Sequence, residues 1–344
     1  MVEPKLKRVT VTSDFWKRYQ ELVVSEVLPY QWAVMNDEAD INMSKDPQKI
    51  KGADKNSHAV ANLKIAAGQM EGHHYGFPFQ DTDVYKWLEA AAYSFSYHPN
   101  PELKTITDNL IELIASAQDD DGYLSTYFQI DAPERKFKRL QQSHELYTMG
   151  HYIEAGVAYH DATGNEKALE IAKRMADCIV RSFGTDDGQI DGYDGHPEIE
   201  LALARLYEAT HDQKYLDEAH YFLQVRGTKP GFFDKQNEAD GLERDIIPGM
   251  REAGERYYLD AQPIADQETA DGHAVRVVYL CTGMAYVARL TGDKVLLEAC
   301  HRFWKDIVKR RMYVTGNVGS TATGEAFTYD YDLPNDTMYG ETCD

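Results

Sequence analysis

The net charge of −21, from 36 basic and 57 acidic residues, argues against binding to nucleic acid or to an anionic membrane surface. The chain has 344 residues, of which 43% are hydrophobic, and this is enough for one large core or two ordinary ones. No apolar run is long enough to cross a bilayer, and the first eight residues, MVEPKLKR, lack the apolar core of a signal peptide. We therefore expect a cytoplasmic protein.

Two predicted helices precede a longer repeated pattern. Apolar spacing after Ser13 predicts a helix that reaches Leu28, and a polar loop over residues 37–56 leads to a second helix at 58–70. From Asp81 onward a helical hairpin recurs at roughly 50 residues. The four copies pair residues 85–93 with a helix that ends at 118, 144–160 with 167–183, 196–209 with 214–225, and 273–290 with 294–310.

The two helices of each hairpin differ in composition. The first is apolar almost all round and rich in alanine and glycine, as expected of an inner helix, whereas the second carries more Lys, Glu and Asp. Two layers of alternating helices that close on themselves form an α/α toroid, and an open solenoid is the structural alternative. We predict an all-α fold, an (α/α)6 toroid or barrel with about ten of its twelve helices in this chain and minor short β segments such as residues 312–315.

Three of the predicted inner helices begin at a histidine, namely His144, His196 and His273. Pro197 suits a first helical turn, which would put His196 at the helix entrance. If the repeat holds, these helix starts lie on one rim of the toroid and the imidazoles converge on its mouth, where helix dipoles favour anions or hydroxyl-bearing ligands. The alternative is that each histidine is simply a polar cap. His58 begins an earlier helix in the same way and is a candidate fourth member.

Glu325 is the best candidate for a general acid/base. It lies in a loop rich in glycine, threonine and aromatic residues, without a lysine or arginine nearby in the sequence. A carboxyl group among Phe327, Tyr329 and Tyr331 would be partly desolvated, and its pKa would rise. Two other acids, Asp81 and Asp83, precede an inner helix and could face the same mouth, but both are equally well explained as helix caps.

Glu341 and Cys343 form a candidate metal-binding pair. Residues two apart point the same way in an extended segment, so both could ligate one ion. The alternative is a buried thiol beside a solvated acid. The other three cysteines, Cys178, Cys281 and Cys300, lie in apolar, helix-like surroundings typical of reduced core residues. Rossmann, P-loop, GxSxG and CxxC motifs are absent from the sequence, which argues against nucleotide cofactors and serine hydrolysis.

Several long strings give the sequence a family resemblance. They are SHAVANLK (57–64), QDTDVYKWLEAAAY (80–93), QQSHELYTMGHYIEA (141–155), DGHPEIELALA (194–204), TADGHAVRVVYLCTG (269–283), RRMYVTG (310–316) and YDYDLPNDTMYGETC (329–343). Over nearly its whole length the sequence resembles glycoside hydrolase family 127 (GH127), the β-L-arabinofuranosidases. The resemblance implies a catalytic (α/α)6 barrel domain over residues 1–344, which in the family is followed by β-sandwich domains that this sequence lacks.

The resemblance also implies a chemistry. Family members are retaining exo-hydrolases that remove terminal β-L-arabinofuranose, with a zinc-bound cysteine thiolate as nucleophile in place of a second carboxylate. Glu325 matches the acid/base, and Glu341 and Cys343 match two of four Zn²⁺ ligands. The sugar-contacting histidines match His144, His196 and His273.

The adjacent cysteine pair that supplies the nucleophile and the last ligand in the family is expected beyond residue 344. We therefore expect the 344-residue chain alone to lack the nucleophile, to be inactive, and to bind zinc weakly or not at all. The rivals are a related α/α-barrel glycosidase for another terminal sugar, a non-catalytic sugar-binding remnant and a metal-free epimerase. The expected partner is a small carbohydrate, an L-arabinofuranoside. A homodimer is one option that the sequence leaves open.

Overall fold

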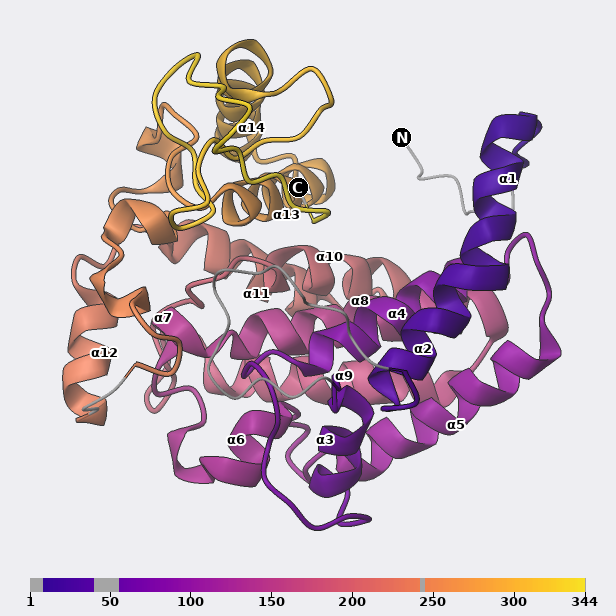
Figure 1. Ribbon diagram of the computed structural model, residues 1–344. Helices are drawn as coiled ribbons and strands as arrows, with labels where there is room; N and C mark the ends of the chain where they lie inside the picture. The colour runs from indigo at the N-terminus through magenta and orange to yellow at the C-terminus, as the bar shows by residue number, and fades with distance from the viewer. Residues whose placement is uncertain (1–8, 40–55, 242–244, 344) are drawn as a thin grey trace. The chain divides into compact units, whose positions relative to one another are not determined.

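The computed structural model describes residues 9–39, 56–241 and 245–343, and these residues are mostly helical (Figure 1). They form two compact units. As far as the described residues go, the first unit comprises Met1–Glu134 and His151–Asp177, and the second comprises Arg135–Gly150 and Cys178–Asp344. The prediction of an all-α fold is confirmed. Among the described residues, no helix combines the length and the apolar character that crossing a membrane requires.

The first unit contains the early helices and the first hairpin. A continuous helical rod is built from α1 (Asp14–Leu22), a π-helical turn η2 (Val23–Val27) and α2 (Leu28–Met35). This unit also contains α3 (Ala59–Ala66), α4 (Asp81–Ser94), α5 (Pro101–Ala117) and α6 (Thr126–Asp131). The helix predicted at 58–70 is shorter than expected, because the chain turns at Gly68 in the left-handed region.

The second unit holds the third and fourth hairpins, whereas most of the second hairpin belongs to the first unit. The chain passes between the units within α8 (Glu145–Thr163) and α9 (Glu166–Ser182). The second unit also contains α7 (Leu140–Ser143), α10 (Ile199–Thr210), α11 (Gln213–Val225), α12 (Phe232–Asp240), α13 (Ala274–Thr291), α14 (Lys294–Asp306) and a terminal π-helical turn η7 (Ile307–Arg311). Short 3-10 turns η4 (Met250–Glu252), η5 (Glu255–Tyr258) and η6 (Ile264–Asp266) lie between α12 and α13.

Local capping explains why the hairpins start where they do. The side chain of Asn100 accepts bonds from two backbone amides of α5, and Asp293 does the same for α14. Asp212 caps α11. Gly292 ends α13 at a φ of 74°, so the chain reverses within two residues before the next cap. The predicted pairing is confirmed by helix contacts for α4 with α5, α10 with α11 and α13 with α14. In the second hairpin the hydroxyl of Tyr152 donates to the carbonyl of Ala168 (3.3 Å).

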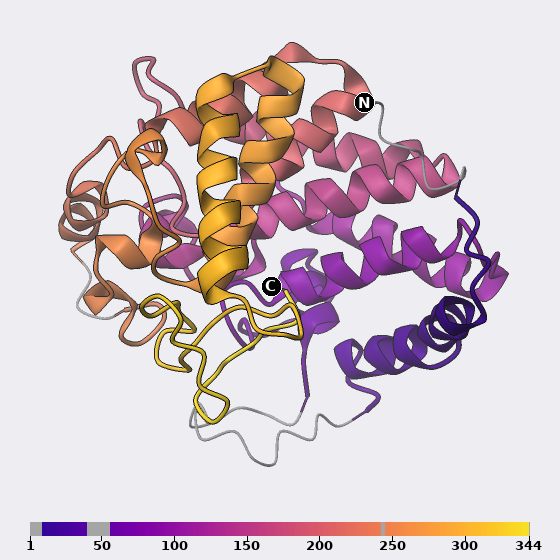
Figure 2. The ribbon, with the colours of Figure 1, turned by 90° about the horizontal axis from the view of Figure 1, so that it is seen from above.

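The hairpin of α13 and α14 shows the expected difference between an inner and an outer helix. The two helices lie side by side in Figure 2 and are in contact, and α13 also contacts α10 and α11. The buried residues of α14 are Leu296, Ala299, Phe303 and Asp306, which share one face. Elsewhere on this helix Val295 and Trp304 are exposed.

The described residues contain isolated β-bridges instead of strands. These bridges are Phe183↔Ile190, His273↔Ala326 and Thr321↔Ala326. The β-like run predicted at 312–315 is wrong. Tyr313 instead closes a tight turn, in which its carbonyl accepts from the amide of Gly316 (2.9 Å) and its amide donates to Asn317 (2.9 Å). The φ of 96° at Gly316 permits this reversal.

Candidate functional site

The three histidines predicted to converge are close together in the second unit. The ring centroids of His144 and His196 are 5.4 Å apart, and those of His196 and His273 are 5.8 Å apart. All three side chains are buried. The starts of three successive hairpins thus bring residues from distant parts of the chain into one cluster.

The histidines are held in three different ways. His144 has a φ of 54° and joins the end of α7 to the start of α8, whereas His273 is the N-cap of α13. The prediction that Pro197 belongs to the first turn of a helix is wrong, because α10 starts at Ile199. His196 is fixed instead by Asp194, whose carboxylate accepts a hydrogen bond from the His196 amide (3.0 Å).

Asp194 is a site residue that the sequence reasoning missed. Its second oxygen accepts from the amide of Leu146 in the first turn of α8 (2.8 Å), so one carboxylate ties together the segments that carry two histidines. Full burial raises the pKa of Asp194 to about 6. A signal was present, since the triplet Asp-Gly-His occurs at both 194–196 and 271–273. At Gly195 a Cβ would lie 2.4 Å from a backbone oxygen, so glycine is required there.

The hydrogen bonds of the first two rings select their tautomer. Nδ1 of His144 lies 2.9 Å from the carbonyl oxygen of Gln142, and Nδ1 of His196 lies 2.8 Å from that of Pro197. A carbonyl can only accept, so Nδ1 carries the proton in both rings. Nε2 is then the hydrogen-bond acceptor when the ring is neutral. Two such nitrogens can accept hydrogen bonds from the hydroxyl groups of a sugar.

His273 has the opposite tautomer. Its Nδ1 accepts from the backbone amide of Arg276 (3.3 Å), so Nε2 carries the proton and donates to Oε2 of Glu325 (3.1 Å). Burial lowers the pKa of His273, and it lowers the pKa of His196 further, with the guanidinium of Arg276 adding to the effect. These two rings are therefore neutral near pH 7.

Glu325 lies beside this cluster and is half-buried. Its hydrogen bond from His273 lowers the pKa of its carboxyl below the ordinary value, against the effect of burial. A hydrogen bond from Tyr339 and the charge of Arg276 act in the same direction. The carboxyl is thus ionised in the free chain, the form that accepts a proton.

The predicted rise in the pKa of Glu325 is therefore wrong for the free chain. The expected apolar wall is incomplete, because Phe327 is buried while Tyr329 and Tyr331 are 73% and 70% exposed. The positive and donating groups come from α13 and from residue 339, which the neighbouring sequence of Glu325 does not reveal. Glu325 also has a φ of 52°, in the left-handed region that is uncommon for residues other than glycine.

The side chains of Glu341 and Cys343 are in contact, in a segment that is neither helix nor strand. The Sγ of Cys343 lies 3.5 Å from Oε2 of Glu341, and both residues are half-buried. Glu341 also approaches the histidine cluster. One ligand atom from each of His273, Glu325 and Glu341 lies within 4.8 Å of the others. The acid/base candidate and the metal-ligand candidate thus belong to one site.

Residues 8–344 match the catalytic domain of the GH127 β-L-arabinofuranosidases. The chain belongs to glycoside hydrolase family 127. It is 57% identical to the non-reducing end β-L-arabinofuranosidase of Bifidobacterium longum subsp. longum, over 97% of this chain and 51% of that protein. The family resemblance inferred from the sequence is confirmed.

Solved structures support the same assignment. The GH127 chain superposes on a GH127 β-L-arabinofuranosidase from Geobacillus stearothermophilus T6 with a TM-score of 0.89 and 47% identity, covering 97% of this chain and 50% of that one. A second GH127 β-arabinofuranosidase gives a TM-score of 0.82 and 33% identity, covering 98% and 48%. These likenesses fit the helical barrel predicted from the repeat. The chain spans about half the length of the relatives it matches.

The donor pair of the GH127 chain fits the zinc ion that the family resemblance implies. Two ligands on a tetrahedral Zn²⁺, with Zn–S of about 2.3 Å and Zn–O of about 2.0 Å, are expected about 3.5 Å apart. The distance between Cys343 Sγ and Glu341 Oε2 is 3.5 Å. A thiolate and a carboxylate are also ligands that Zn²⁺ accepts. Glu341 and Cys343 could therefore hold such an ion together.

The other cysteines suit the predicted core role better than a nucleophilic one. All four are free thiols, and Cys178 is buried. Burial raises the pKa of Cys281 to about 12 and that of Cys300 to about 11. Their thiolate fraction near neutral pH is therefore very small, and the thiolate is the reactive form.

Tyrosines surround the histidines of the GH127 chain, and the sequence reasoning missed them. The ring of Tyr147 lies 4.4 Å from that of His196, and Tyr279 lies 5.5 Å from the same ring. The ring of Tyr257 lies 5.5 Å from that of His273. Aromatic side chains of this kind commonly line small-molecule sites, and they provide flat apolar contact beside polar groups. Helical spacing offered a signal for Tyr147, since it follows His144 by three residues.

Two earlier candidates lie in the first unit and have local roles there. His58 donates from its amide to Asp37, and its Nδ1 lies 2.8 Å from the same carboxylate. Asp81 is fully buried and accepts from the amide (2.8 Å) and hydroxyl of Thr126. Asp81 therefore anchors Thr126 instead of capping its own helix.

Proposed function

We propose that the protein is an exo-acting, retaining β-L-arabinofuranosidase that releases terminal β-L-arabinofuranose. The observation that carries the proposal is the group of three buried histidines beside the carboxylate of Glu325. A 57% identical relative bears the name of this activity. The substrate partner is a small L-arabinofuranoside.

The histidines bind the sugar. Nε2 of His144 and Nε2 of His196 accept hydrogen bonds from its hydroxyl groups, since their Nδ1 atoms face carbonyl oxygens. Burial lowers the pKa of His196, and its neutral ring does not attract a competing anion. Tyr147 and Tyr279, which lie beside His196, cover the apolar faces of the sugar ring. All of these contacts are made with a single sugar unit, as an exo-acting enzyme requires.

Glu325 moves the proton. In the free chain its carboxylate accepts from His273 and is ready to act as a base toward water. A bound sugar removes water from Glu325, which raises the pKa of its carboxyl toward the protonated form. That form donates a proton to the departing oxygen. The same residue then serves first as acid and later as base.

Glu341 and Cys343 would hold the zinc ion, together with two cysteines expected beyond residue 344, one of them the nucleophile. When bound, zinc would lower the pKa of the nucleophilic thiol and improve it as a leaving group. The cytoplasmic location and the homodimer stay predictions from the sequence.

Zinc content and turnover test the proposal. Elemental analysis should find zinc in a version extended through the next two cysteines and little in the 344-residue chain. The extended version should hydrolyse an aryl β-L-arabinofuranoside in preference to a panel of other aryl glycosides. Hydrolysis of another terminal sugar would support the related-glycosidase rival, whereas binding without hydrolysis would support the sugar-binding remnant. Absence of zinc from both forms would refute the metal-thiolate chemistry.

A further inference from the structure

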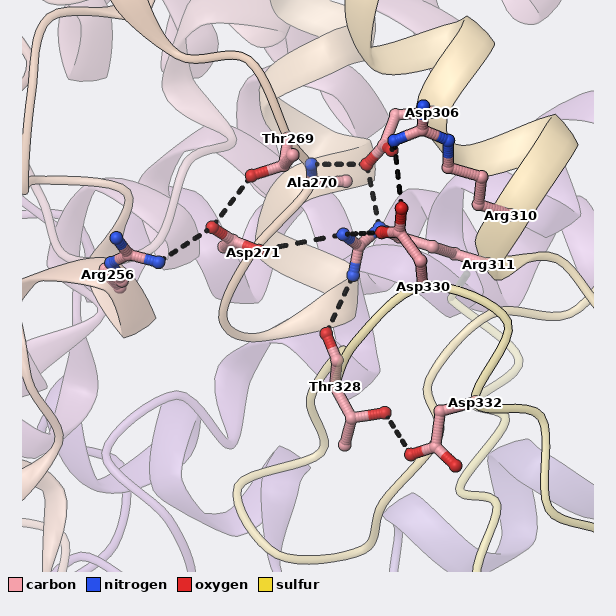
Figure 3. Close-up of polar contacts among 10 residues, drawn as sticks. All are labelled: Arg256, Thr269, Ala270, Asp271, Asp306, Arg310, Arg311, Thr328, Asp330 and Asp332. Atoms are coloured by element: carbon pink, nitrogen blue, oxygen red, sulfur yellow. Dashed lines mark hydrogen bonds and ion pairs between the residues drawn. The ribbon is translucent and has the colours of Figure 1, made fainter.

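A cluster of ion pairs surrounds Arg311 at the end of η7 (Figure 3). The side chain of Arg311 is 4% exposed, and Asp306, at the end of α14, is equally buried. Nε of Arg311 donates to Oδ2 of Asp306 (2.7 Å), and Nη2 donates to Oδ1 of Asp330 (2.9 Å). Arg310 also donates to Asp330 (3.0 Å), but its side chain is 42% exposed. The planar guanidinium of Arg311 binds both carboxylates at once through different nitrogens, and the single ammonium group of a lysine cannot reproduce this arrangement.

The cluster joins two loops that are far apart in the sequence. On one side, Oδ2 of Asp306 accepts from the backbone amide of Ala270 (2.9 Å). On the other side, Nη1 of Arg311 donates to the backbone carbonyl of Thr328 (2.7 Å). Figure 3 shows these groups facing one another across the end of the helix. Ala270 lies three residues before His273, and Thr328 lies three residues after Glu325.

Between these anchors the two loops pair directly. The amide of Phe327 donates to the carbonyl of Gly272 (2.8 Å), and the amide of Ala274 donates to the carbonyl of Glu325 (3.0 Å). This short antiparallel contact pairs His273 with Ala326 and so fixes the backbone of the adjacent Glu325 close to His273. Glu325 has a φ of 52°, a conformation that persists only where neighbouring structure enforces it. The contact is too short to be stable alone, so it needs an anchor at its end.

We propose that Arg311 and Asp306 are positioning residues that hold the loop of Glu325 against the loop of His273. The cluster touches neither candidate directly and acts through the two backbone hydrogen bonds. The claim that these residues hold the two loops together does not depend on the protein's activity. The expected effect on catalysis rests on the proposed glycosidase function. When the guanidinium of Arg311 is removed, the two backbone hydrogen bonds between the loops break more easily. Glu325 is then no longer held beside His273.

Hydrogen exchange of the backbone tests the structural part. In Arg311→Lys, the amides of Ala274 and Phe327 should exchange at least about tenfold faster, because a charge-assisted anchor is lost. Arg302→Lys is the matched control. It is the same substitution on α14, and Arg302 also donates to backbone carbonyls, those of Ala265 (2.7 Å) and Gln267 (3.2 Å). The control should leave the exchange of both amides unchanged.

A milder variant keeps the test decisive if Arg311→Lys does not fold. Asp330→Asn removes one charge at a 40% exposed position, and it should speed exchange of the same two amides by a smaller factor. Unchanged exchange in Asp330→Asn and in a folded Arg311→Lys would overturn the proposal. Equal effects in Arg302→Lys would also overturn it, since they would indicate general loosening.

Kinetics test the catalytic part. In the zinc-loaded, extended enzyme, Arg311→Lys should lower kcat for an aryl β-L-arabinofuranoside by about tenfold to a hundredfold with little change in KM, since displacement of Glu325 affects the chemical step. A rise in KM alone would contradict this role. If the unsubstituted enzyme turns over no glycoside, the proposed function fails, and the exchange measurements still decide whether the cluster positions the loop.

Discussion

Replacing Glu218 with glutamine should flatten the dependence of the protein's stability on pH. Glu218 lies on α11 and is 8% exposed. No described residue offers a hydrogen-bond partner to its Oε1. Burial raises the pKa of this carboxyl to about 8, from an ordinary value of 4.5. The folded state therefore holds a proton that the unfolded state releases at lower pH.

The sign and size of the effect follow from proton linkage. Because the folded pKa is raised, the stabilising contribution is complete below the ordinary pKa and is lost as the pH rises toward about 8. The slope is at most about 1.4 kcal/mol for each pH unit. Between about pH 5 and pH 8, Glu218 should lower the free energy of unfolding by roughly 3 kcal/mol. Glutamine has a similar shape and no titrating proton, so Glu218→Gln should lose this contribution.

Urea denaturation at about pH 5, 6, 7 and 8 measures the effect. The unfolding free energy of the unsubstituted chain should fall more steeply with pH than that of Glu218→Gln, with a difference of roughly 3 kcal/mol across the series. Glu238→Gln is the control, because it makes the same change at an exposed position on α12. The control should alter stability by less than about 0.5 kcal/mol at every pH. Parallel pH profiles for Glu218→Gln and the unsubstituted chain would refute the reasoning.

Three further substitutions test the proposed site in the extended, zinc-loaded enzyme. Glu325→Gln should lower kcat by about a hundredfold to ten-thousandfold, because glutamine cannot transfer the proton, and unchanged kinetics would remove Glu325 from the mechanism. His196→Ala should raise KM and lower kcat/KM by about tenfold or more, through loss of a hydrogen bond to the sugar, which inhibition by free L-arabinose can confirm independently. Cys343→Ser should reduce bound zinc in elemental analysis, and full zinc occupancy would contradict its role as a ligand.

The sequence by itself determined the helices and their pairing. Apolar periodicity and caps such as Asn100, Asp212 and Asp293 act within a few residues, so they can be recognised without knowing the fold. The repeat also indicated that His144, His196 and His273 share one region, because equivalent positions in stacked hairpins come together. The spacing of Glu341 and Cys343 also marked them as a pair, and their side chains are in contact.

The tertiary structure alone decided the electrostatics of the site. The carboxyl of Glu325 is governed by His273, which is 52 residues away in the sequence, so its aromatic neighbours predicted the wrong direction for its pKa. The role of Asp194 and that of the Arg311 guanidinium likewise depend on backbone groups of other segments. Protonation and positioning are set by whichever groups lie within a few ångströms, and folding brings those groups together from distant parts of the chain.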